Sequence, residues 1–393
     1  MSFRITSSLL LLTSLAISGC KEKKQSLSQT STEPTTKQVL SIENDDGVLA
    51  DFQAMEKWQQ VNESNTGFFK KNGPKQVSSW KAAAERCSGK GMILYARCLQ
   101  EGAGVAKNEV EAVQWFSKAA ENGNTDALNC LGICYIYGFG VEKDSIEALR
   151  LFRKAAELKN PRATQSVGFC YRLGVGVAQD LSEASKYFRT AAELGNSKAM
   201  LNLGESYFNG MGVVKDEVEA IKWFCKAADH GNLLAMFNLG VCYRDGIGGK
   251  KDLEEALKWF HKAAEGGIAG AMFELGICYR DGTGVTKDTA EGVKWLKKAS
   301  EGEKKIIAMN AMNELGRCYI NGIGVTKDFV EASKWFRKAA DLGHADAMYN
   351  LGVCYFNGSG VPKNPSVGEK YFQKAADLGS TEANAALRQL GNE

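Results

Sequence analysis

The chain has 393 residues, of which 44% are hydrophobic, so it is long enough to bury a large core. Its 49 basic and 46 acidic residues nearly balance, and no basic cluster is interleaved with aromatic residues, so we expect no nucleic-acid partner. Three histidines are few for an acid–base enzyme, and 42 glycines against 5 prolines favour many short turns between helices.

The first 20 residues, MSFRITSSLLLLTSLAISGC, have the form of a secretory signal. Arg4 precedes an apolar run that is too short to remain as a membrane-spanning helix, and small residues follow it. The last four residues, Ile17 to Cys20, resemble the bacterial lipobox. This resemblance implies that residues 1–19 are a lipoprotein signal peptide and that Cys20 carries acyl chains. The alternative is an ordinary cleaved signal with a chance cysteine.

Several acyl chains on Cys20 would hold the chain stably on a membrane, so the lipobox implies a lipid-anchored protein of the cell envelope. Lys21 stands where an aspartate would signal retention in the inner membrane. By analogy with bacterial lipoproteins, this favours the outer membrane, with the protein facing either the periplasm or the cell surface. Residues 20–46 are rich in Ser, Thr, Lys and Gln, and we expect an acylated N-terminus followed by a disordered tether.

An internal repeat accounts for most of the remaining chain. A block of the form A-x-x-x-[LV]-G-x-x-Y recurs every 36 residues, with one step of 40 residues (271 to 311). The block begins at Ala127, Ala163, Ala199, Ala235, Ala271, Ala311 and Ala347. Weaker copies flank it, so we predict a helical N-terminal cap with a degenerate half-repeat at 47–90, eight repeats at 91–382 and a C-terminal capping helix at 383–393.

The first half of each repeat predicts a helix of about eleven residues, for example from Ala235 to Asp245. Ala235, Leu239 and Cys242 follow the i, i+4, i+7 spacing of an apolar helix face. Gly246 is well suited to end this helix, because glycine adopts a left-handed backbone at little cost. The glycine at the sixth position of the block is expected to let the paired helices approach closely.

The second half of each repeat predicts a helix with a capping box, in which an N-cap aspartate accepts from backbone N–H groups and a glutamate three residues later reaches back. This Asp-x-x-Glu signal begins at Asp144, Asp180, Asp216, Asp252, Asp288 and Asp328. Residues such as Ala220, Trp223 and Phe224 then give the helix an apolar face. The final repeat has Asn364-Pro365 and lacks the glutamate, although proline suits the first helical position.

The glycine pairs between the two helices, such as Gly282 and Gly284, have the G-x-G spacing of nucleotide-binding loops. A phosphate-binding loop follows a strand, whereas these pairs follow a predicted helix and recur in nearly every repeat. We therefore interpret the pairs as joints between helices, and we expect no cofactor.

The combined pattern, A-x-x-x-L-G-x-x-Y-x-x-G-x-G-V-x-x-D-x-x-E-A-x-x-W-F-x-K-A-A, resembles the Sel1-like repeat, a relative of the tetratricopeptide repeat. The resemblance implies an all-α fold, a right-handed α/α superhelical solenoid of antiparallel helix pairs. Repeats of this class bury their apolar faces by stacking on one another, so a long run is expected to fold as one array.

Eleven cysteines in an exported chain raise the question of disulfides. Seven occupy one equivalent core position, and copies one repeat apart are expected about 10 Å from each other, too far for a bridge. These are Cys98, Cys134, Cys170, Cys242, Cys278, Cys318 and Cys354. Cysteine-rich Sel1 relatives bridge their helices through a K-A-C segment, whose cysteine is replaced by alanine here. We predict mostly free, buried thiols and leave open the redox state of Cys87, Cys130 and Cys225.

An enzymatic function finds little support in the sequence. Cysteine-rich Sel1 relatives have been labelled penicillin-binding or β-lactamase-like, and Ser78 and Lys81 form an S-x-x-K motif, but no S-D-N or K-T-G motif accompanies it. His230, His261 and His344 stand at non-equivalent positions without ligands at helical spacing, so we expect exposed helix residues and no metal site. We predict that the protein is not an enzyme and takes no small-molecule substrate.

Function is expected at the variable positions of the first helices, because the consensus positions serve packing. The Sel1 resemblance implies that these helices line a concave face, and Arg and aromatic residues beside Asn and Glu are typical of protein or peptide recognition. The candidate partner-binding residues are Phe237, Asn238, Arg244, Phe273, Glu274, Arg280, Glu314, Arg317, Tyr349 and Asn350. An ordinary solvated helix face is the alternative for each of them.

An insertion near Glu303–Ile307 is a second candidate, because its two isoleucines either anchor a partner or belong to a longer helix. The sequence as a whole predicts a membrane-anchored bacterial lipoprotein whose solenoid is a protein-interaction scaffold or adaptor in the cell envelope. The alternatives are a surface-exposed factor that binds host proteins and a β-lactamase-like or cell-wall-acting hydrolase.

Overall fold

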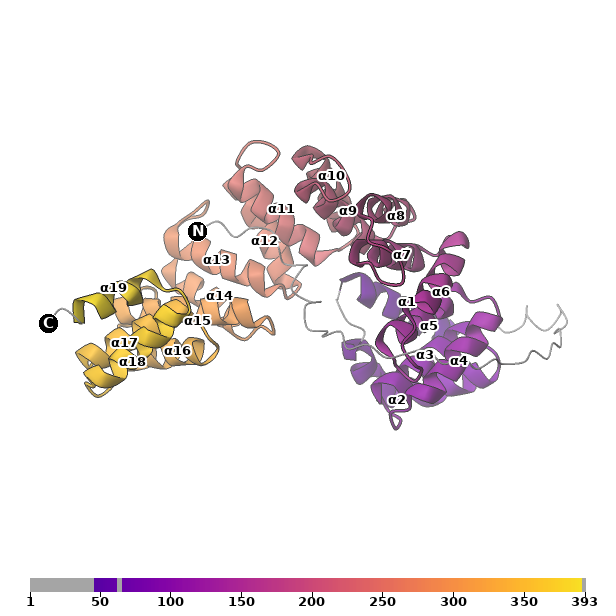
Figure 1. Ribbon diagram of the computed structural model, residues 1–393, viewed down its shortest axis with the longest axis horizontal. Coiled ribbons are helices and arrows are strands. Elements are labelled where there is room, and N and C mark those ends of the chain that lie inside the picture. Colours follow the sequence, from indigo (N-terminus) through magenta and orange to yellow (C-terminus); the bar gives the residue numbers. More distant parts are fainter. Residues whose placement is uncertain (1–45, 62–65, 391–393) are drawn as a thin grey trace. The chain divides into compact units, whose positions relative to one another are not determined.

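The computed structural model of the protein describes residues 46–61 and 66–390 (Figure 1). Within these ranges the regular structure is entirely helical, with 19 α-helices and no β-strand. None of these helices is both long and apolar enough to cross a membrane. The predicted signal peptide (1–19), Cys20 and nearly all of the predicted tether (20–46) lie outside the described residues.

The contacts between Cα atoms divide the chain into two compact units. The first unit ends within and just after α7, at residues 170 and 174–178, and the second holds residues 171–173 and everything from 179 onward. The helices of the first unit are α1 (Asp46–Val61), α2 (Thr66–Glu85), α3 (Gly89–Glu101), α4 (Glu109–Glu121), α5 (Thr125–Tyr137), α6 (Ser145–Glu157) and most of α7 (Pro161–Leu173).

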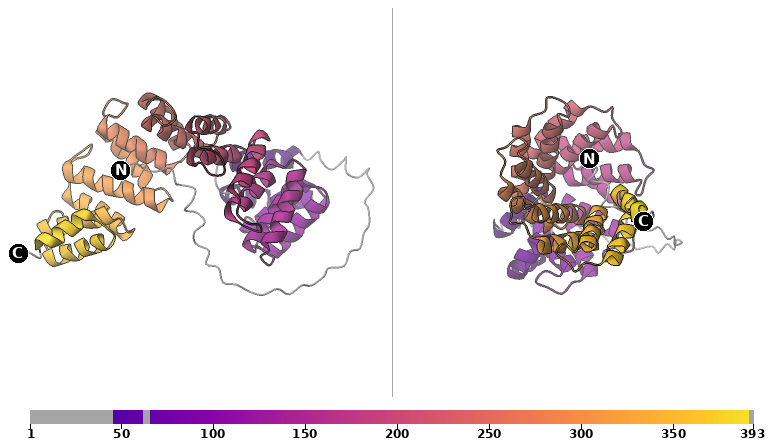
Figure 2. Two further views of the ribbon diagram at one scale, coloured as in Figure 1. Left: turned by 45° about the horizontal axis from the view of Figure 1, so that its top comes forward. Right: turned by 90° about the vertical axis from the view of Figure 1, so that its left-hand side faces the viewer.

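The second unit contains twelve further helices, each of which packs against the next one along the chain (Figures 1 and 2). They are α8 (Leu181–Glu193), α9 (Ser197–Asn209), α10 (Glu217–Asp229), α11 (Leu233–Asp245), α12 (Leu253–Glu265), α13 (Ala269–Asp281), α14 (Thr289–Ser300), α15 (Lys305–Asn321), α16 (Phe329–Asp341), α17 (Ala345–Asn357), α18 (Pro365–Asp377) and α19 (Thr381–Leu390). In the first unit, α2 to α6 pack in the same sequential way. This arrangement confirms the predicted all-α solenoid of stacked helix pairs.

The first helix of each repeat begins earlier than the hydrophobic pattern predicts. In α11 the helix starts at Leu233, because the Asn232 side chain accepts a hydrogen bond from the Ala235 N–H and caps the N-terminus. Its end is as predicted, since Gly246 has a φ of 72° and its N–H donates to the Cys242 carbonyl. The apolar periodicity showed where the helix packs but did not show the polar residue that starts it.

The second helix of each repeat has the predicted N-cap but no capping box. In α10 the Asp216 carboxylate accepts from the Glu219 N–H at 2.9 Å, as predicted. Glu219 does not reach back, because the Asp216 N–H already donates to the Tyr207 carbonyl at 2.9 Å. The Glu219 carboxylate instead pairs with Lys222 at 3.0 Å. The same exchange of partner occurs in α6, α8, α12, α14 and α16.

Glycines permit the close approach of backbones at two kinds of position. In the first helices, a Cβ on Gly240 would lie 2.5 Å from the Phe260 ring of the paired helix. In the joints, Gly212 has a φ of 72°, and a Cβ there would lie 1.9 Å from the Leu181 carbonyl oxygen at the start of the preceding second helix. Gly282 and Gly284 have φ values of 75° and 74° after α13, which confirms that the G-x-G segment is a joint.

The described cysteines are free, and the seven at the equivalent position are buried, as predicted. Burial raises the pKa of Cys134 and Cys242 to about 12, so both thiols stay protonated at neutral pH. Cys130 is also a free buried thiol, Cys225 is half-buried and Cys87 is exposed.

Two of the histidines differ from the prediction of exposed helix residues. His261 is half-buried, with Nε2 3.1 Å from the Tyr279 hydroxyl. His344 precedes α17 and caps it, since its Nδ1 accepts from the Ala347 N–H at 3.3 Å, and burial lowers the pKa of its imidazole. His230 is exposed but follows α10 as its C-cap.

The insertion near Glu303–Ile307 lengthens a helix. α15 has 17 residues, whereas the other first helices of the second unit have 13. Four residues are about one helical turn, so the rest of α15 keeps the direction of its apolar face. Ile306 is 46% exposed at the start of the added turn.

Candidate protein-interaction surface

The ten predicted partner-binding residues all lie on the first helices α11, α13, α15 and α17 of the second unit. They occupy equivalent places in successive repeats, which we number from the alanine that opens the block. Phe237, Phe273 and Tyr349 stand at the third position. We call this set of ten residues, together with Asp245, Asp281 and Asn313, the first-helix surface.

Charged residues of the first-helix surface pair with one another across repeat boundaries. Arg244, at the tenth position of its repeat, lies 2.7 Å from Glu274, at the fourth position of the next repeat. Arg280 makes the same contact with Glu314, which also accepts from Arg317 at 3.0 Å. These contacts form a ladder of ion pairs that runs from α11 to α15.

The ladder fixes its charges more firmly than a typical surface ion pair. The side chains of Arg244 and Glu274 are only 18% and 12% exposed, so water screens their attraction weakly. Arg244 also donates two hydrogen bonds to Asp245 at 2.8 Å, and these lower the pKa of that carboxyl. The geometry therefore holds the Asp245 carboxylate ionised at neutral pH and fixes the orientation of the paired side chains.

Amide side chains continue this ladder toward the C-terminus. Asn350 Nδ2 donates to Asn313 Oδ1 of the preceding repeat at 3.0 Å. Asn313 is 5% exposed and Asn238 is 6% exposed, so both amides are largely buried. Asn238 therefore offers little area to a partner, although the sequence pattern placed it among the candidates.

The aromatic residues of the surface are half-buried rather than free. The Phe237 ring packs on Phe260, with centroids 5.9 Å apart, and Tyr349 packs on Phe372 at 5.4 Å. Phe273 packs against the buried residues shared by α14 and α15. Each ring is held by its neighbours while part of it remains accessible, so a partner would meet a rigid aromatic group.

The sequence identified the residues of this surface but not their pairing. Each pair joins the tenth position of one repeat to the fourth position of the next, 30 or 34 residues later. A comparison of opposite charges at these two positions along the repeats would have found both Arg–Glu contacts.

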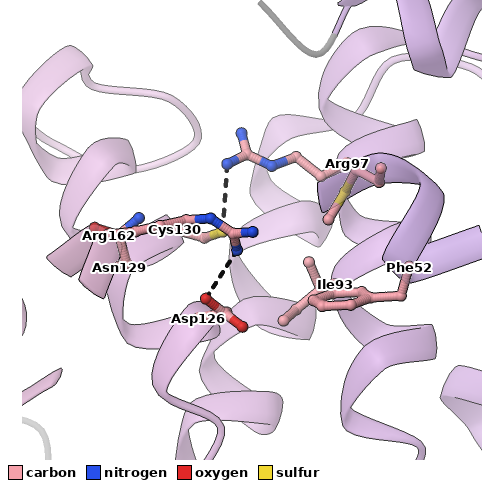
Figure 3. Close-up of a pocket in the computed structure, with 8 residues that line it drawn as sticks. Phe52, Ile93, Arg97, Asp126, Asn129, Cys130 and Arg162 are labelled. Atoms are coloured by element: carbon pink, nitrogen blue, oxygen red, sulfur yellow. Dashed lines mark hydrogen bonds and ion pairs between the residues drawn. The ribbon is translucent and has the colours of Figure 1, made fainter. Parts of the chain in front are cut away.

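The first unit contains a small cavity of about 20 Å³, which is close to the volume that one water molecule needs (Figure 3). Phe52 and Met55 of α1 line it together with residues of α3, α5 and α7: Ile93, Arg97, Asp126, Asn129, Cys130 and Arg162. Arg162 pairs with Asp126 at 3.0 Å, and Arg97 donates to the Cys130 sulfur at 3.3 Å. Burial raises the pKa of Cys130, so this thiol is not an activated nucleophile.

In the part of the chain that the structure describes, no group of three or more His, Cys, Asp or Glu side chains is placed to hold a metal ion. Ser78 and Lys81 are both exposed on α2, and Lys81 approaches Glu85 at 4.0 Å. This arrangement does not activate the serine, because the lysine is directed to a carboxylate on its own helix.

Stacked antiparallel helix pairs with a ladder of polar contacts along one set of helices define an α-solenoid repeat protein. The sequence model described as Sel1 repeat matches eight consecutive segments, and together they cover more than half of the chain. The matched residues are 89–124, 125–160, 161–196, 197–232, 233–268, 269–303, 310–344 and 345–380. The chain therefore belongs to the Sel1 repeat family.

Two solved structures are similar to this chain over most of its length. One is c5321 of uropathogenic Escherichia coli, described as a protective antigen with an SLR fold, at 32% identity and a TM-score of 0.68, covering 80% of this chain and 67% of that chain. The other is a Sel1 repeat protein of Oxalobacter formigenes, at 30% identity and a TM-score of 0.57, covering 83% and 93%. A search of the curated proteins finds no significant match.

Proposed function

We propose that the protein is a membrane-anchored bacterial lipoprotein whose solenoid serves as a scaffold or adaptor for other proteins in the cell envelope. Solenoids of the Sel1 repeat class are commonly scaffolds for protein–protein interaction. The lipobox-like segment that ends at Cys20 supports the membrane anchor.

The observation that carries the interaction role is the first-helix surface of the second unit. It combines half-buried aromatic rings, such as Tyr349, with carboxylates and guanidinium groups that the Arg–Glu ladder holds in place. Aromatic residues and arginines dominate protein interfaces, and groups that are already ordered lose little entropy on binding. We therefore place the partner protein or peptide on this surface, which is the predicted concave face. Its side chains are ordered by packing and ion pairs, and part of each aromatic ring remains accessible.

A protein exposed on the cell surface that binds host proteins is the second candidate function. This candidate is supported by the similar Escherichia coli protein, which is described as a protective antigen. The two candidates differ in the side of the envelope on which the repeats lie.

The membrane anchor is tested by metabolic labelling with a palmitate analogue in cells that produce the chain or its Cys20→Ala variant. We expect label, a smaller processed form and membrane fractionation for the parent, and loss of all three for the variant. Equal fractionation of both proteins would contradict the anchor. A hydrolase function is tested separately with nitrocefin, for which we expect no turnover.

The side of the envelope is tested by protease treatment of intact cells, with lysed cells alongside as the control. Digestion of the repeats in intact cells supports the surface-exposed function. Protection until lysis supports a scaffold in the periplasm.

A further inference from the structure

Helix α1 buries an apolar stripe although it lies outside the repeats. Val48, Phe52 and Met55 follow the i, i+4, i+7 spacing of an amphipathic helix and are 2%, 3% and 2% exposed. The family match begins only at residue 89, and α2 already packs against α3, the first helix of the first repeat. The array therefore has a terminal covering helix without α1.

The residues beneath α1 stand at the repeat positions that form the first-helix surface in the second unit. Phe52 and Met55 line the small cavity together with Ile93 and Asn129, which are third-position residues, and Cys130, a fourth-position residue (Figure 3). The equivalent residues in the second unit include Phe237 and Tyr349 at the third position. In the first unit, the chain's own helix covers these positions.

The charged groups of α3 and α5 beneath α1 have hydrogen-bond partners that do not depend on it. Asp126 accepts from Arg162 at 3.0 Å and from Asn160 at 2.9 Å, and Arg97 donates to Gln100 at 2.8 Å. If α1 left, these groups would keep their partners and become accessible to water, so no buried charge would lose its hydrogen bonds. The Trp80 indole of α2 donates a hydrogen bond to Asp51 of α1 at 2.8 Å, and on the departure of α1 water can take the place of that carboxylate.

We propose that the face of α3 and α5 in the first unit is an exchangeable docking site for an amphipathic helix, and that α1 is its resident occupant. The site takes a helix with apolar side chains at i, i+4 and i+7, and a partner helix with this pattern binds there when α1 leaves. Helix-in-groove binding of this kind relies on a few apolar anchors. The inference goes beyond the proposed function, since it concerns a different surface, in the first unit, and does not depend on the membrane anchor or on the first-helix surface.

The test supplies α1 in trans as a labelled peptide of residues 46–61 and measures its binding to the full-length chain by fluorescence anisotropy. A chain with Phe52→Asp and Met55→Asp should release its own α1 and bind the peptide saturably. The unsubstituted chain should bind it at least tenfold more weakly, because its site is occupied. A peptide with the same two substitutions should not bind.

The matched control is a chain with Gln53→Asp and Ala54→Asp, which adds the same charge to the exposed face of α1. It should keep its site occupied and bind the peptide as weakly as the unsubstituted chain. Failure of the Phe52/Met55 variant to bind while it keeps its helical circular dichroism would overturn the proposal. Equal binding by the variant and by the unsubstituted chain would overturn it too.

Hydrogen exchange on the unsubstituted chain keeps the proposal testable if the Phe52/Met55 variant fails to fold. The amides of α1 should exchange at least tenfold faster than those of α3 to α6, because α1 opens while the repeats stay folded. Equal protection would make α1 a fixed part of the fold and would refute the exchangeable site. Neither result bears on the proposed scaffold function, which rests on the second unit and on Cys20.

Discussion

Lys159 and Cys87 are the residues other than glycine that have a positive φ in the described chain, at 59° and 65°. Both stand where most other repeats carry a glycine, for example Gly123 and Gly195, in the turn that follows a second helix. A residue with a Cβ in this left-handed conformation is disfavoured by about 1–2 kcal/mol, whereas glycine is not. The repeat therefore imposes a left-handed backbone conformation that lysine and cysteine do not favour.

The Lys159→Gly substitution should raise the free energy of unfolding by about 1 kcal/mol, because it removes this strain. The exposed Lys154 in the last turn of α6 provides the matched control, since Lys154→Gly should lower stability by up to about 1 kcal/mol through lost helix propensity. Urea unfolding of the three proteins measures both effects. If Lys159→Gly and Lys154→Gly changed the free energy of unfolding in the same direction, that result would contradict the backbone strain at Lys159.

Two glycines separate the cost of backbone conformation from that of backbone crowding. Gly195 has a φ of 88° and nothing within 4 Å of an added Cβ, whereas Gly212 has a φ of 72° and the Leu181 oxygen at 1.9 Å. Gly195→Ala should cost about 1–2 kcal/mol. Gly212→Ala should cost at least about 1–3 kcal/mol more, because the backbone of the neighbouring repeat must move. Equal losses in thermal or urea unfolding would mean that the joints are not tightly packed.

The row of buried cysteines should make stability depend on pH in the alkaline range. Burial raises the pKa of the seven equivalent thiols to about 11 or 12 in the folded chain, whereas an unfolded thiol titrates near 8.5. The unfolded chain therefore loses its thiol protons first. The stabilisation is complete below about pH 8.5 and declines as pH rises toward the folded-state pKa.

Each such thiol should contribute a slope of about 1.4 kcal/mol per pH unit between about pH 9 and 11. Removal of one thiol by Cys242→Ala should reduce the measured slope of unfolding free energy against pH by this amount. The slope is the relevant quantity, since the lost packing of the side chain shifts stability at every pH. An unchanged slope would show that Cys242 is not buried as described.

At the scale of the helix, the N-cap aspartate and the glutamate that follows it have different roles. Asp216 accepts the Glu219 N–H, which is otherwise without an intrahelical partner, whereas Glu219 pairs with an exposed lysine. Asp216→Ala should therefore cost about 1 kcal/mol. Glu219→Ala should change stability much less, because exposed ion pairs contribute little. Thermal unfolding of both variants decides between this arrangement and a capping box, in which both losses would be comparable.

The elements themselves were largely predictable, because the repeat shows each signal many times. The Asp N-caps, the terminal glycines and the apolar faces predict both helices of each repeat. Two features were not predictable from periodicity. Asn232 starts α11 two residues ahead of its apolar stripe, and the carbonyl of Tyr207 takes the N–H that the capping box required. The second depends on a contact between two helices, which no local pattern contains.

At the scale of the whole molecule, the sequence predicted the solenoid but not how the residues of the first-helix surface contact one another. Residues such as Arg280 and Glu314 stood out as variable positions, yet their pairing across repeats needs the three-dimensional stacking. α1 shows the same limit, since its apolar stripe is visible in the sequence while the face that it covers is not. The lipid anchor at Cys20 remains a prediction from the lipobox resemblance alone.

The interaction surface is tested most directly by site-specific photo-crosslinking in cells that produce the full-length chain. A photoreactive residue would replace Arg317 or Tyr349 on the first-helix surface, and Lys258 on the exposed side of α12 would serve as the control. We predict that both surface positions give a discrete crosslinked protein of the same mass, and that position 258 does not. Crosslinks from position 258 alone, or none from either surface position, would contradict a scaffold that binds its partner on the first helices.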